Sequence, residues 1–169
     1  MKGPVMMQFL SGIRSLYKPV FTDDTLALYL DAFTGEDSSD IGASQTFSFI
    51  IRPAKGRQEI GRISLRYGES SQLYYFGHIG YHIDEPYRGH GYAAHACLLM
   101  LPLLQRLRMK NAVITTDVDN LPSRKTCEKL GCVLENIVDV PTAYQRDYEL
   151  SPRKCRYIWR IPMSVKGKQ

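Results

Sequence analysis

Short apolar segments with the character of strands follow one another in the first half of the chain. They are rich in Phe, Ile and Tyr, and turn residues such as Gly56 and Gly68 separate them. This pattern predicts strands over Thr46–Ile51, Glu59–Tyr67 and Tyr74–Ile83. Because short turns join these strands, we expect them to form an antiparallel meander.

Two further elements are expected ahead of this meander. An apolar run near the start predicts a first strand, Val5–Leu10. Three large apolar residues then recur at helical spacing, which predicts a helix over Asp23–Phe33 with Thr22 as its N-cap. The polar segment Gly35–Gly42 follows this helix and is interpreted as a loop.

The second half of the chain alternates longer apolar segments with short β-branched ones. The dense apolar run Gly91–Leu107 is too long for a strand and predicts a buried helix, which Pro102 should kink near residue 98 or end early. Asn120 is the expected N-cap of a second helix that stops at Gly131. Three more strands are predicted, over Ala112–Val118, Val133–Val140 and Cys155–Ile161.

These elements predict one α/β (α+β) domain that spans residues 1–169. An antiparallel meander followed by alternating strands and helices gives a mixed, mostly antiparallel sheet of about seven strands flanked by helices. The length of 169 residues agrees with this interpretation, since it is typical of one domain.

Composition and charge narrow the class of protein only moderately. Apolar residues make up 44% of the chain and charged residues 23%, as in most globular proteins, and no run approaches the ~18 apolar residues of a membrane span. A net charge of +5 suits a polyanionic partner without choosing one. The four cysteines form no C-x-x-C pair, and no secretion signal is recognised. We therefore expect reduced thiols, no metal site and a cytoplasmic location.

The segment most informative about chemistry joins the third predicted strand to the buried helix, and it reads GYHIDEPYRGHGYA from Gly80 to Ala93. The start of a helix leaves backbone N–H groups without partners and carries the positive end of the helix dipole, so it can bind an anion. Gly89 and Gly91 would let phosphate oxygens approach the backbone closely, and Arg88 adds a positive charge.

Two motifs at a defined spacing carry a family resemblance. The segment IGYHIDEPYRGHGYAAHA is similar to motif A of the GNAT superfamily of N-acetyltransferases, with Arg88, Gly91 and Ala93 at its R/Q-x-x-G-x-G/A positions. The segment NLPSRKTCEKLGCVLE resembles motif B of the same family, and its matching residues are Asn120, Ser123, Lys129, Gly131 and Glu135. The order of predicted elements agrees with the family up to about residue 163, and the two motifs are similar to those of the ribosomal-protein N-terminal acetyltransferase branch.

The resemblance implies that the chain binds acetyl-coenzyme A as its cosubstrate. The pantetheine arm would pair with the backbone of the strand that ends at Ile83, like an added strand. Asn120 would either face the arm near the thioester or serve only as an N-cap, and both roles stay open. The pyrophosphate would lie on the backbone N–H groups of Arg88, Gly89, His90, Gly91, Tyr92 and Ala93.

The implied reaction is the attack of an amine on the thioester carbonyl. It needs a base for the ammonium proton and a donor for the oxyanion, for which a backbone N–H near Ile83 is the candidate. By the alternation of a strand, His78, His82 and Asp84 share one face of the third predicted strand, and Tyr81 lies on the other. We take His82 as the base, because imidazole titrates near neutral pH.

The leaving sulfur raises a separate question. Many family members carry a tyrosine acid seven residues after the motif B asparagine, where this chain has Cys127. Ser123 is the candidate that would hydrogen-bond the departing sulfur instead. The other interpretation is that Ser123 is a first-turn residue that bonds its own helix.

Two functions therefore compete. The first is an N-acetyltransferase that moves an acetyl group from acetyl-CoA to a primary amine, either a peptide N-terminus or a small molecule, by direct attack. The alternative is a non-catalytic acyl-CoA-binding module, which the missing tyrosine favours. No aromatic–basic motif supports RNA binding, so we expect no nucleic-acid or membrane partner, and a monomer or homodimer. The acidic residues Glu36, Asp37 and Asp40 either line the acceptor mouth or solvate a loop.

Overall fold

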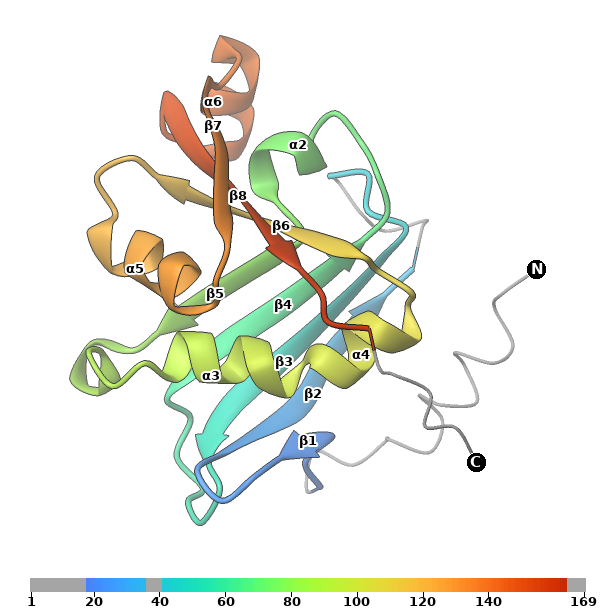
Figure 1. Cartoon of the computed structure of the whole chain (residues 1–169), viewed down its shortest axis with the longest axis vertical. Helices are drawn as coiled ribbons and strands as arrows, with labels where there is room; N and C mark the ends of the chain where they lie inside the picture. The colour runs from blue at the N-terminus through green and yellow to red at the C-terminus, as the bar shows by residue number, and fades with distance from the viewer. Residues whose placement is uncertain (1–17, 36–40, 164–169) are drawn as a thin grey trace.

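The computed structural model describes residues 18–35 and 41–163 of the chain. The strand predicted over Val5–Leu10 and the acidic residues Glu36, Asp37 and Asp40 lie outside this part. Within it, one sheet has the strand order β1-β2-β3-β4-β5-β6-β8-β7 (Figure 1). The strands are β1 (Phe21–Thr22), β2 (Leu26–Thr34), β3 (Gln45–Pro53), β4 (Gly61–Tyr67), β5 (Ile79–Ile83), β6 (Asn111–Asp117), β7 (Val133–Asp139) and β8 (Arg153–Arg160).

The pairing confirms a mixed, mostly antiparallel sheet with helices against it. All neighbouring strands of the described sheet run antiparallel except β5 and β6, which run parallel. Figure 1 shows α3 and α4 crossing one face of the sheet, and α3 packs against β2, β4, β5 and α5. The helices are α2 (Leu73–Phe76), α3 (Tyr92–Leu99), α4 (Leu101–Arg106), α5 (Leu121–Lys129) and α6 (Thr142–Tyr148), with a 3-10 turn η2 (Glu85–Tyr87).

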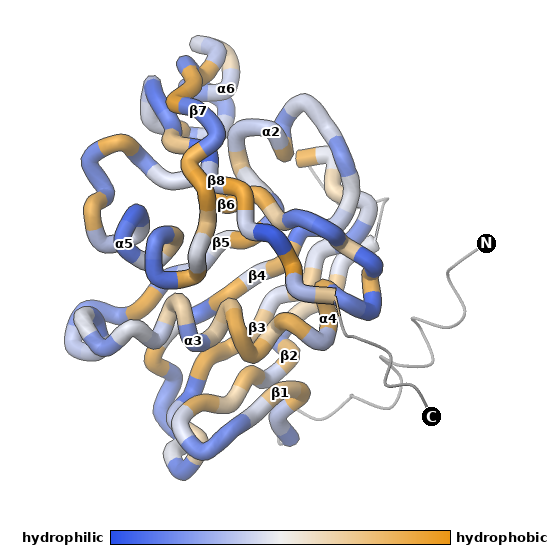
Figure 2. Tube along the Cα trace, viewed as in Figure 1, coloured by the Kyte–Doolittle hydropathy of each residue, from blue (hydrophilic) through white to orange (hydrophobic). Residues whose placement is uncertain are grey.

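The hydrophobic core lies between the sheet and the α3–α4 segment. Alternate residues of β3 face it, and their cross-strand partners in β4 include Ile63 and Leu65. Small residues on α3, such as Ala96 and Cys97, are fully buried and let the helix approach the strands closely. Figure 2 shows hydrophobic residues along the central strands and along the helical segment that crosses them.

The helix predicted over Asp23–Phe33 is wrong, because this stretch forms β2. The Asp23 carboxylate accepts hydrogen bonds from the backbone of Thr25 and Leu26, at 2.8 and 2.9 Å, and so makes the turn that sends β1 into β2. Thr22 donates to the Leu26 carbonyl instead of capping a helix. The apolar positions of this run fit both the 3.6-residue repeat of a helix and the two-residue repeat of a strand. The long antiparallel pairing with β3 stabilises the strand.

The single long strand predicted over Tyr74–Ile83 is also wrong in its first half. Residues 73–76 form the one-turn helix α2, whose first backbone N–H donates to Ser70 Oγ at 2.9 Å. Gly77 then turns the chain at φ +72°, a left-handed conformation that favours glycine, and β5 begins two residues later. The propensity of the tyrosines for strands is overridden by this local hydrogen bonding.

The remaining elements follow the predictions closely. The buried helix breaks at Met100 into α3 and α4, because Pro102 has no N–H to donate to the carbonyl of Leu98. Asn120 caps α5, and the strands predicted from 46, 59, 112, 133 and 155 onward all form, with bounds shifted by a few residues. Helix α6 was not predicted. No helix of the described residues is long and apolar enough to cross a membrane.

Candidate active site

The parallel strands β5 and β6 part almost as soon as they meet. Their only laddered pair is Ile79 with Ile114, whereas β4 pairs with β5 along its whole length, up to Ile83. From Gly80 onward, the edge of β5 that faces β6 therefore offers backbone groups that no described strand takes up. Such an edge can pair with an extended ligand.

A cavity of about 190 Å³ lies where these strands part. Its lining comes from β4, α2, β5, β6, α5 and β8, and it includes the predicted site residues Asn120 and Ser123. It also includes Arg66 and Tyr81, which the sequence did not single out as cavity residues. The cavity therefore lies between the unpaired edge of β5 and the first turn of α5.

Asn120, Ser123 and Tyr81 form a connected polar group on one side of this cavity. Asn120 Oδ1 accepts the Ser123 N–H at 3.1 Å, which confirms Asn120 as the N-cap. The Ser123 hydroxyl lies 2.9 Å from the Tyr81 hydroxyl, which also donates to the Ser123 carbonyl at 3.3 Å. The same tyrosine oxygen lies 4.0 Å from the sulfur of Cys127. A phenol from β5 thus reaches the position on α5 where the family tyrosine is missing.

The predicted phosphate loop lies beyond the other end of β5. Gly89 and Gly91 have φ of +83° and +75°, so both adopt the left-handed conformation that glycine favours, and Gly91 is the N-cap of α3. The amide of His95 is the first of α3 to bond back, to Gly91 O at 3.1 Å, so the earlier amides keep the free N–H groups of a helix start. The predicted role of the Arg88 backbone N–H is not supported, because this N–H donates to Glu85 O at 3.2 Å. The Arg88 side chain folds back and donates through Nε to Ile83 O at 2.8 Å.

Lys129 brings a second positive charge to this loop. Its ammonium lies so close to Gly91 that a β-carbon built there would come within 2.5 Å of Nζ. The residue lies in the last turn of α5, and α5 packs against α3. From the sequence, Lys129 is only a match to motif B, because its approach to Gly91 depends on how the two helices pack.

The predicted base His82 lies on the opposite face of β5 from Tyr81. In the register with β4, His82 pairs with Arg62 and Tyr81 pairs with the buried Ile63. The His82 side chain is 65% exposed, and its Nε2 lies 3.5 Å from Asp84 Oδ1. His82 does not line the cavity, and its catalytic role remains a prediction.

His78, on the same face by sequence, is a buried structural residue. Its Nδ1 accepts the Val113 N–H at 2.9 Å, and its Nε2 lies 3.3 Å from Gly68 O. Accepting at Nδ1 places the proton of the neutral ring on Nε2. Burial lowers the pKa of His78 below its usual value, and the Glu69 carboxylate 3.8 Å away only partly offsets this.

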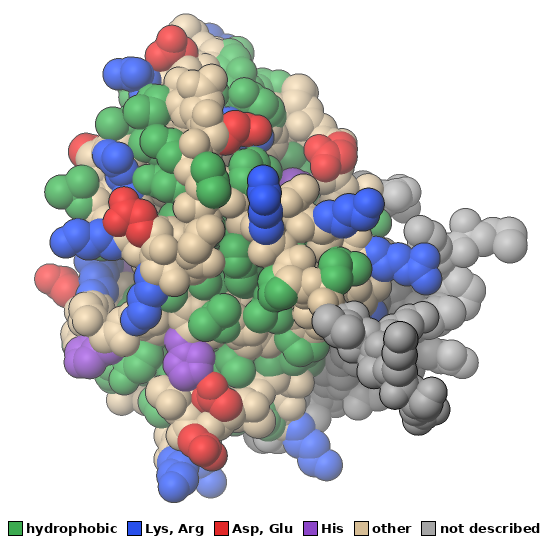
Figure 3. Space-filling view, in the orientation of Figure 1, with side chains coloured by type: hydrophobic (Ala, Val, Ile, Leu, Met, Phe, Trp, Pro, Cys, Tyr) green, Lys and Arg blue, Asp and Glu red, His purple; other side chains and the backbone are tan. Residues whose placement is uncertain are grey.

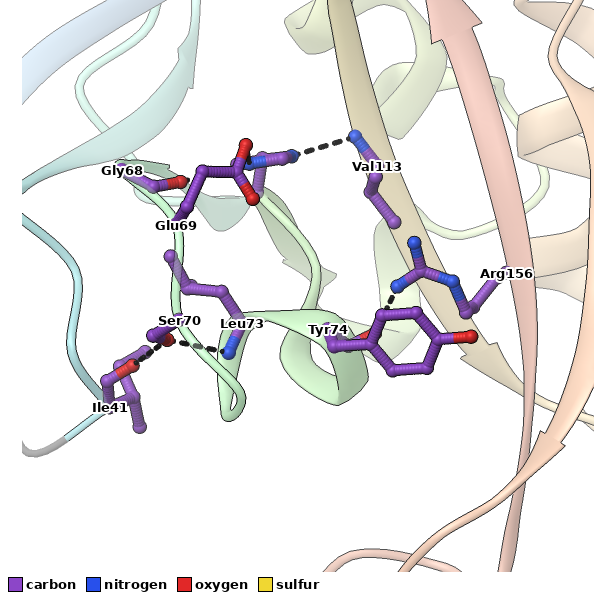
Figure 4. A network of polar contacts seen from close by, with 9 residues as sticks. Ile41, Gly68, Glu69, Ser70, Leu73, Tyr74, Val113 and Arg156 are labelled. Carbon is purple, nitrogen blue, oxygen red and sulfur yellow. Dashed lines mark hydrogen bonds and ion pairs between the residues drawn. The ribbon is translucent and has the colours of Figure 1, made fainter.

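A polar network holds α2 against the rest of the sheet (Figure 4). Arg156 of β8 donates to the Tyr74 carbonyl, and its guanidinium lies 3.7 Å from the centre of the Tyr74 ring. The Ser70 hydroxyl bridges Leu73 N and Ile41 O. Because α2 supplies Tyr75 and Phe76 to the cavity lining, this network fixes one wall of the cavity.

The surface charge agrees with the modest basic excess of the sequence. Lys and Arg side chains are spread over the face shown in Figure 3 and are interspersed with acidic ones. Among residues 18–35 and 41–163, no group of three or more His, Cys, Asp and Glu could hold a metal ion. Cys97, Cys127 and Cys155 are free thiols, as expected, and all three are buried.

The chain belongs to the GNAT acetyltransferase family. The profile of the acetyltransferase (GNAT) domain matches residues 4–133, which is more than half of the chain. This match confirms the predicted resemblance and the acyltransferase class, and it supports acetyl-CoA as the cosubstrate. A search of curated protein sequences finds no significant match.

Solved structures confirm the fold at low sequence identity. The apo form of RimL, the ribosomal L7/L12 alpha-N-protein acetyltransferase, has 21% identity and a TM-score of 0.52 over 69% of this chain and 70% of its own. The microcin C7 self immunity acetyltransferase MccE, in complex with acetyl-CoA and AMP, has 19% identity and a TM-score of 0.52 over 69% of this chain and 61% of its own.

A third solved structure is the ribosomal-protein-S5-alanine acetyltransferase from Vibrio fischeri. It has 18% identity and a TM-score of 0.52 over 73% of this chain and 64% of its own. The chain therefore spans less than two thirds of the length of this enzyme and of MccE.

Proposed function

We propose that the chain is an N-acetyltransferase that moves the acetyl group of acetyl-CoA to a primary amine by direct attack, in the cytoplasm. The observation that carries the proposal is the cavity between β5 and β6, which combines a free strand edge with the hydroxyl pair of Tyr81 and Ser123. A donor arm paired with that edge would bring its thioester to these hydroxyls. The names of the similar structures, which include acetyl-CoA and coenzyme A complexes, agree with this donor.

The two ends of the donor would use different features of the chain. The pyrophosphate binds at the N-terminus of α3, where Gly89 and Gly91 keep the backbone accessible and Arg88 and Lys129 supply positive charge. The pantetheine arm pairs with β5 beyond Ile79. The contacts that bind the phosphates are therefore remote from the reacting carbonyl, so they contribute binding energy without taking part in the chemical step.

The reaction itself requires three proton and charge adjustments. The amine loses a proton to a base and attacks the carbonyl carbon, and a backbone N–H of β5 near Ile83 stabilises the oxyanion. The tetrahedral intermediate then collapses, the C–S bond breaks, and the electron pair leaves on the sulfur. Ser123 donates a hydrogen bond to that sulfur, and Tyr81 orients the Ser123 hydroxyl. The products are an N-acetyl amide and free coenzyme A.

The acceptor amine approaches on the face of β5 that carries Gly80 and His82. Residues two apart on a strand share a face, so both lie opposite Tyr81, which is on the leaving-group side. His82 is our candidate base on this approach, because Asp84 lies beside its ring and its exposed side chain can pass the proton to solvent.

The experiment that tests the proposal is an assay of free thiol released from acetyl-CoA by a panel of amines. The panel covers peptide N-termini, polyamines and aminoglycosides, and the amide product is confirmed by mass spectrometry. Thiol release that depends on an amine supports the proposal. Binding of acetyl-CoA without transfer to any amine would instead identify a non-catalytic acyl-CoA-binding module.

A further inference from the structure

Arg66 on β4 lines the cavity, and some of its guanidinium N–H donors make no hydrogen bond to the described residues. Its Nη1 donates to the carbonyls of Phe76 and Gly77, at 3.4 and 3.2 Å. Within the part of the chain that the structure describes, its Nε and Nη2 donate to no residue. Bracing α2 therefore occupies one of the three guanidinium nitrogens, and the other two remain for a ligand.

The charge of Arg66 is not balanced by a neighbouring carboxylate. The other charged residues of the cavity lining are Asp117 and Lys154, and these pair with each other. Among residues 18–35 and 41–163, no Asp or Glu lies within ion-pair distance of Arg66. The lining thus carries one uncompensated positive charge, and partial burial of the guanidinium makes that charge costly. Burial also lowers the pKa of Arg66, which reflects the same cost.

The guanidinium lies on the face of the sheet from which the acceptor would approach. A β-carbon built on Gly80 would lie 3.1 Å from Arg66 Nη2, so the arginine lies directly over this glycine. Gly80 and His82 share that face, whereas Tyr81 and Ser123 contact each other on the other. The position is therefore on the acceptor side of the transfer and away from the expected phosphate loop.

We propose that Arg66 binds an anionic group, a carboxylate or a phosphate, carried by the amine acceptor. This inference rests on the proposed acetyltransferase function and specifies its substrate class as small amines that bear an anion near the amino group. The planar fork of a guanidinium matches both anions through two parallel hydrogen bonds.

Electrostatics explains why such an acceptor is favoured over a simple amine. An alkylammonium ion brings a second positive charge beside Arg66, and like charges repel strongly in a partly desolvated cavity. An acceptor that carries its own anion pairs with the guanidinium instead and arrives with no net repulsion. The same field favours loss of the ammonium proton, which must precede attack on the thioester.

The test compares acceptors that differ only in the anion. Glycine is compared with glycinamide, and O-phosphoethanolamine with ethanolamine, so the two pairs separate carboxylate from phosphate recognition. For wild-type protein we expect kcat/KM for at least one acceptor with an anion to exceed that of its partner without the anion by roughly 10- to 100-fold. Arg66→Met should remove this preference without changing the acetyl-CoA dissociation constant. Arg66→Lys should keep only part of it.

Arg62→Met is the matched control. Arg62 lies four residues away on the same strand and the same face, but it pairs with Asp31 and Glu59 and does not line the cavity. Its loss should leave the preference unchanged.

The wild-type comparison needs no variant, so it decides even if Arg66→Met fails to fold. Equal or faster acetylation of the partners that lack the anion would overturn the inference and leave the acetyltransferase function intact. Retention of the preference in a folded Arg66→Met protein would do the same. Failure of every amine in the panel would instead count against the proposed function itself.

Discussion

The hydroxyl of Tyr81 on β5 lies 2.9 Å from the hydroxyl of Ser123 on α5, across the point where the sheet opens. Burial raises the pKa of Tyr81 well above its usual range, so the phenol stays protonated at neutral pH and can act as a donor. When it donates to Ser123 Oγ in place of the Ser123 carbonyl, the serine proton is free to point into the cavity. In the proposed reaction, the pair would form a short relay that ends at the leaving sulfur.

The first prediction concerns this pair. Tyr81→Phe should lower turnover about fivefold, since one hydrogen bond is worth about 1 kcal/mol, and should leave the acetyl-CoA dissociation constant nearly unchanged. Ser123→Ala should also lower turnover, by a limited factor, because water can replace a serine hydroxyl at the sulfur. Steady-state kinetics and calorimetric titration with coenzyme A measure the two quantities.

The double variant distinguishes a relay from two independent residues. If Tyr81 acts only through Ser123, the combined substitution should be no slower than Ser123→Ala alone. Multiplied effects in the double variant would show that each hydroxyl acts separately.

The second prediction is that acetyl-CoA stabilises the folded chain. A ligand that binds only the native state adds about 2.7 kcal/mol at 100 times its dissociation constant, which corresponds to roughly 5–10 °C in the melting temperature of a chain of this size. Thermal denaturation with and without acetyl-CoA measures the shift, with AMP alone as the control. An unchanged melting temperature in millimolar acetyl-CoA would contradict the assignment of the cosubstrate.

The third prediction distinguishes two contributions to coenzyme A binding at the phosphate loop, the open space at Gly91 and the positive charge of Lys129. Gly91→Val should cost about 1–2 kcal/mol of stability, because φ is positive there, but it should weaken coenzyme A binding by a larger factor, since the side chain fills the space of the phosphates. Lys129→Met should weaken binding roughly 3- to 10-fold with little change in stability, because the lysine is exposed.

Gly131→Val is the control for backbone strain, because Gly131 lies after α5 and outside the phosphate loop. Its φ is +74°, and a β-carbon built there meets no atom within 4 Å, so this variant adds a strained residue without a steric contact. Parallel losses of stability and affinity in Gly91→Val would indicate a connector rather than a binding loop.

The sequence predicted the parts of the fold that local chemistry determines. Asn120 as an N-cap, the break caused by Pro102 and the strands after residue 111 all depend on neighbours in the chain, and all are confirmed. The helix over Asp23–Phe33 failed because its apolar positions fit a strand equally well. Only the pairing with β3, about 20 residues away, decides between them.

Only those residues of the candidate site that belong to a sequence motif were predicted. Ser123 and Asn120 were found because they belong to a motif, and the structure brings both to the cavity. Arg66 carried no signal, since an arginine in an alternating strand is usually a solvated residue. The partnership of Tyr81 with Ser123 joins residues 42 positions apart, and it follows from how α5 packs over β5 rather than from any local pattern.

The fourth prediction concerns the pH dependence of stability. Because burial lowers the pKa of His78, the unfolded chain takes up a proton below about pH 6.5 that the folded chain resists. The free energy of unfolding should therefore fall as pH decreases below 6.5, by at most about 1.4 kcal/mol per pH unit from this group. Urea denaturation at pH 7.5 and 5.5 measures the slope.

His78→Gln should reduce that slope, because an amide oxygen can still accept the Val113 N–H but does not titrate. His90→Gln, at an exposed position, should leave it as in the wild type. An equal slope in the His78 variant would assign the pH dependence to other groups.

The last prediction is that His82 contributes to the transfer step rather than to cosubstrate binding. If His82 is the base, His82→Ala should lower turnover by roughly 100- to 10,000-fold, with the acetyl-CoA dissociation constant barely changed. The base acts only when neutral, so the wild-type rate should fall toward acidic pH, and the variant should lose this acidic limb.

Asp84→Asn should have a smaller effect, since Asp84 lies beside the His82 ring and only orients it. Measured pH–rate profiles of the three proteins decide the point. Near-normal turnover in His82→Ala would remove the histidine from the mechanism and leave Asp84 or a chain of waters as the route of the proton.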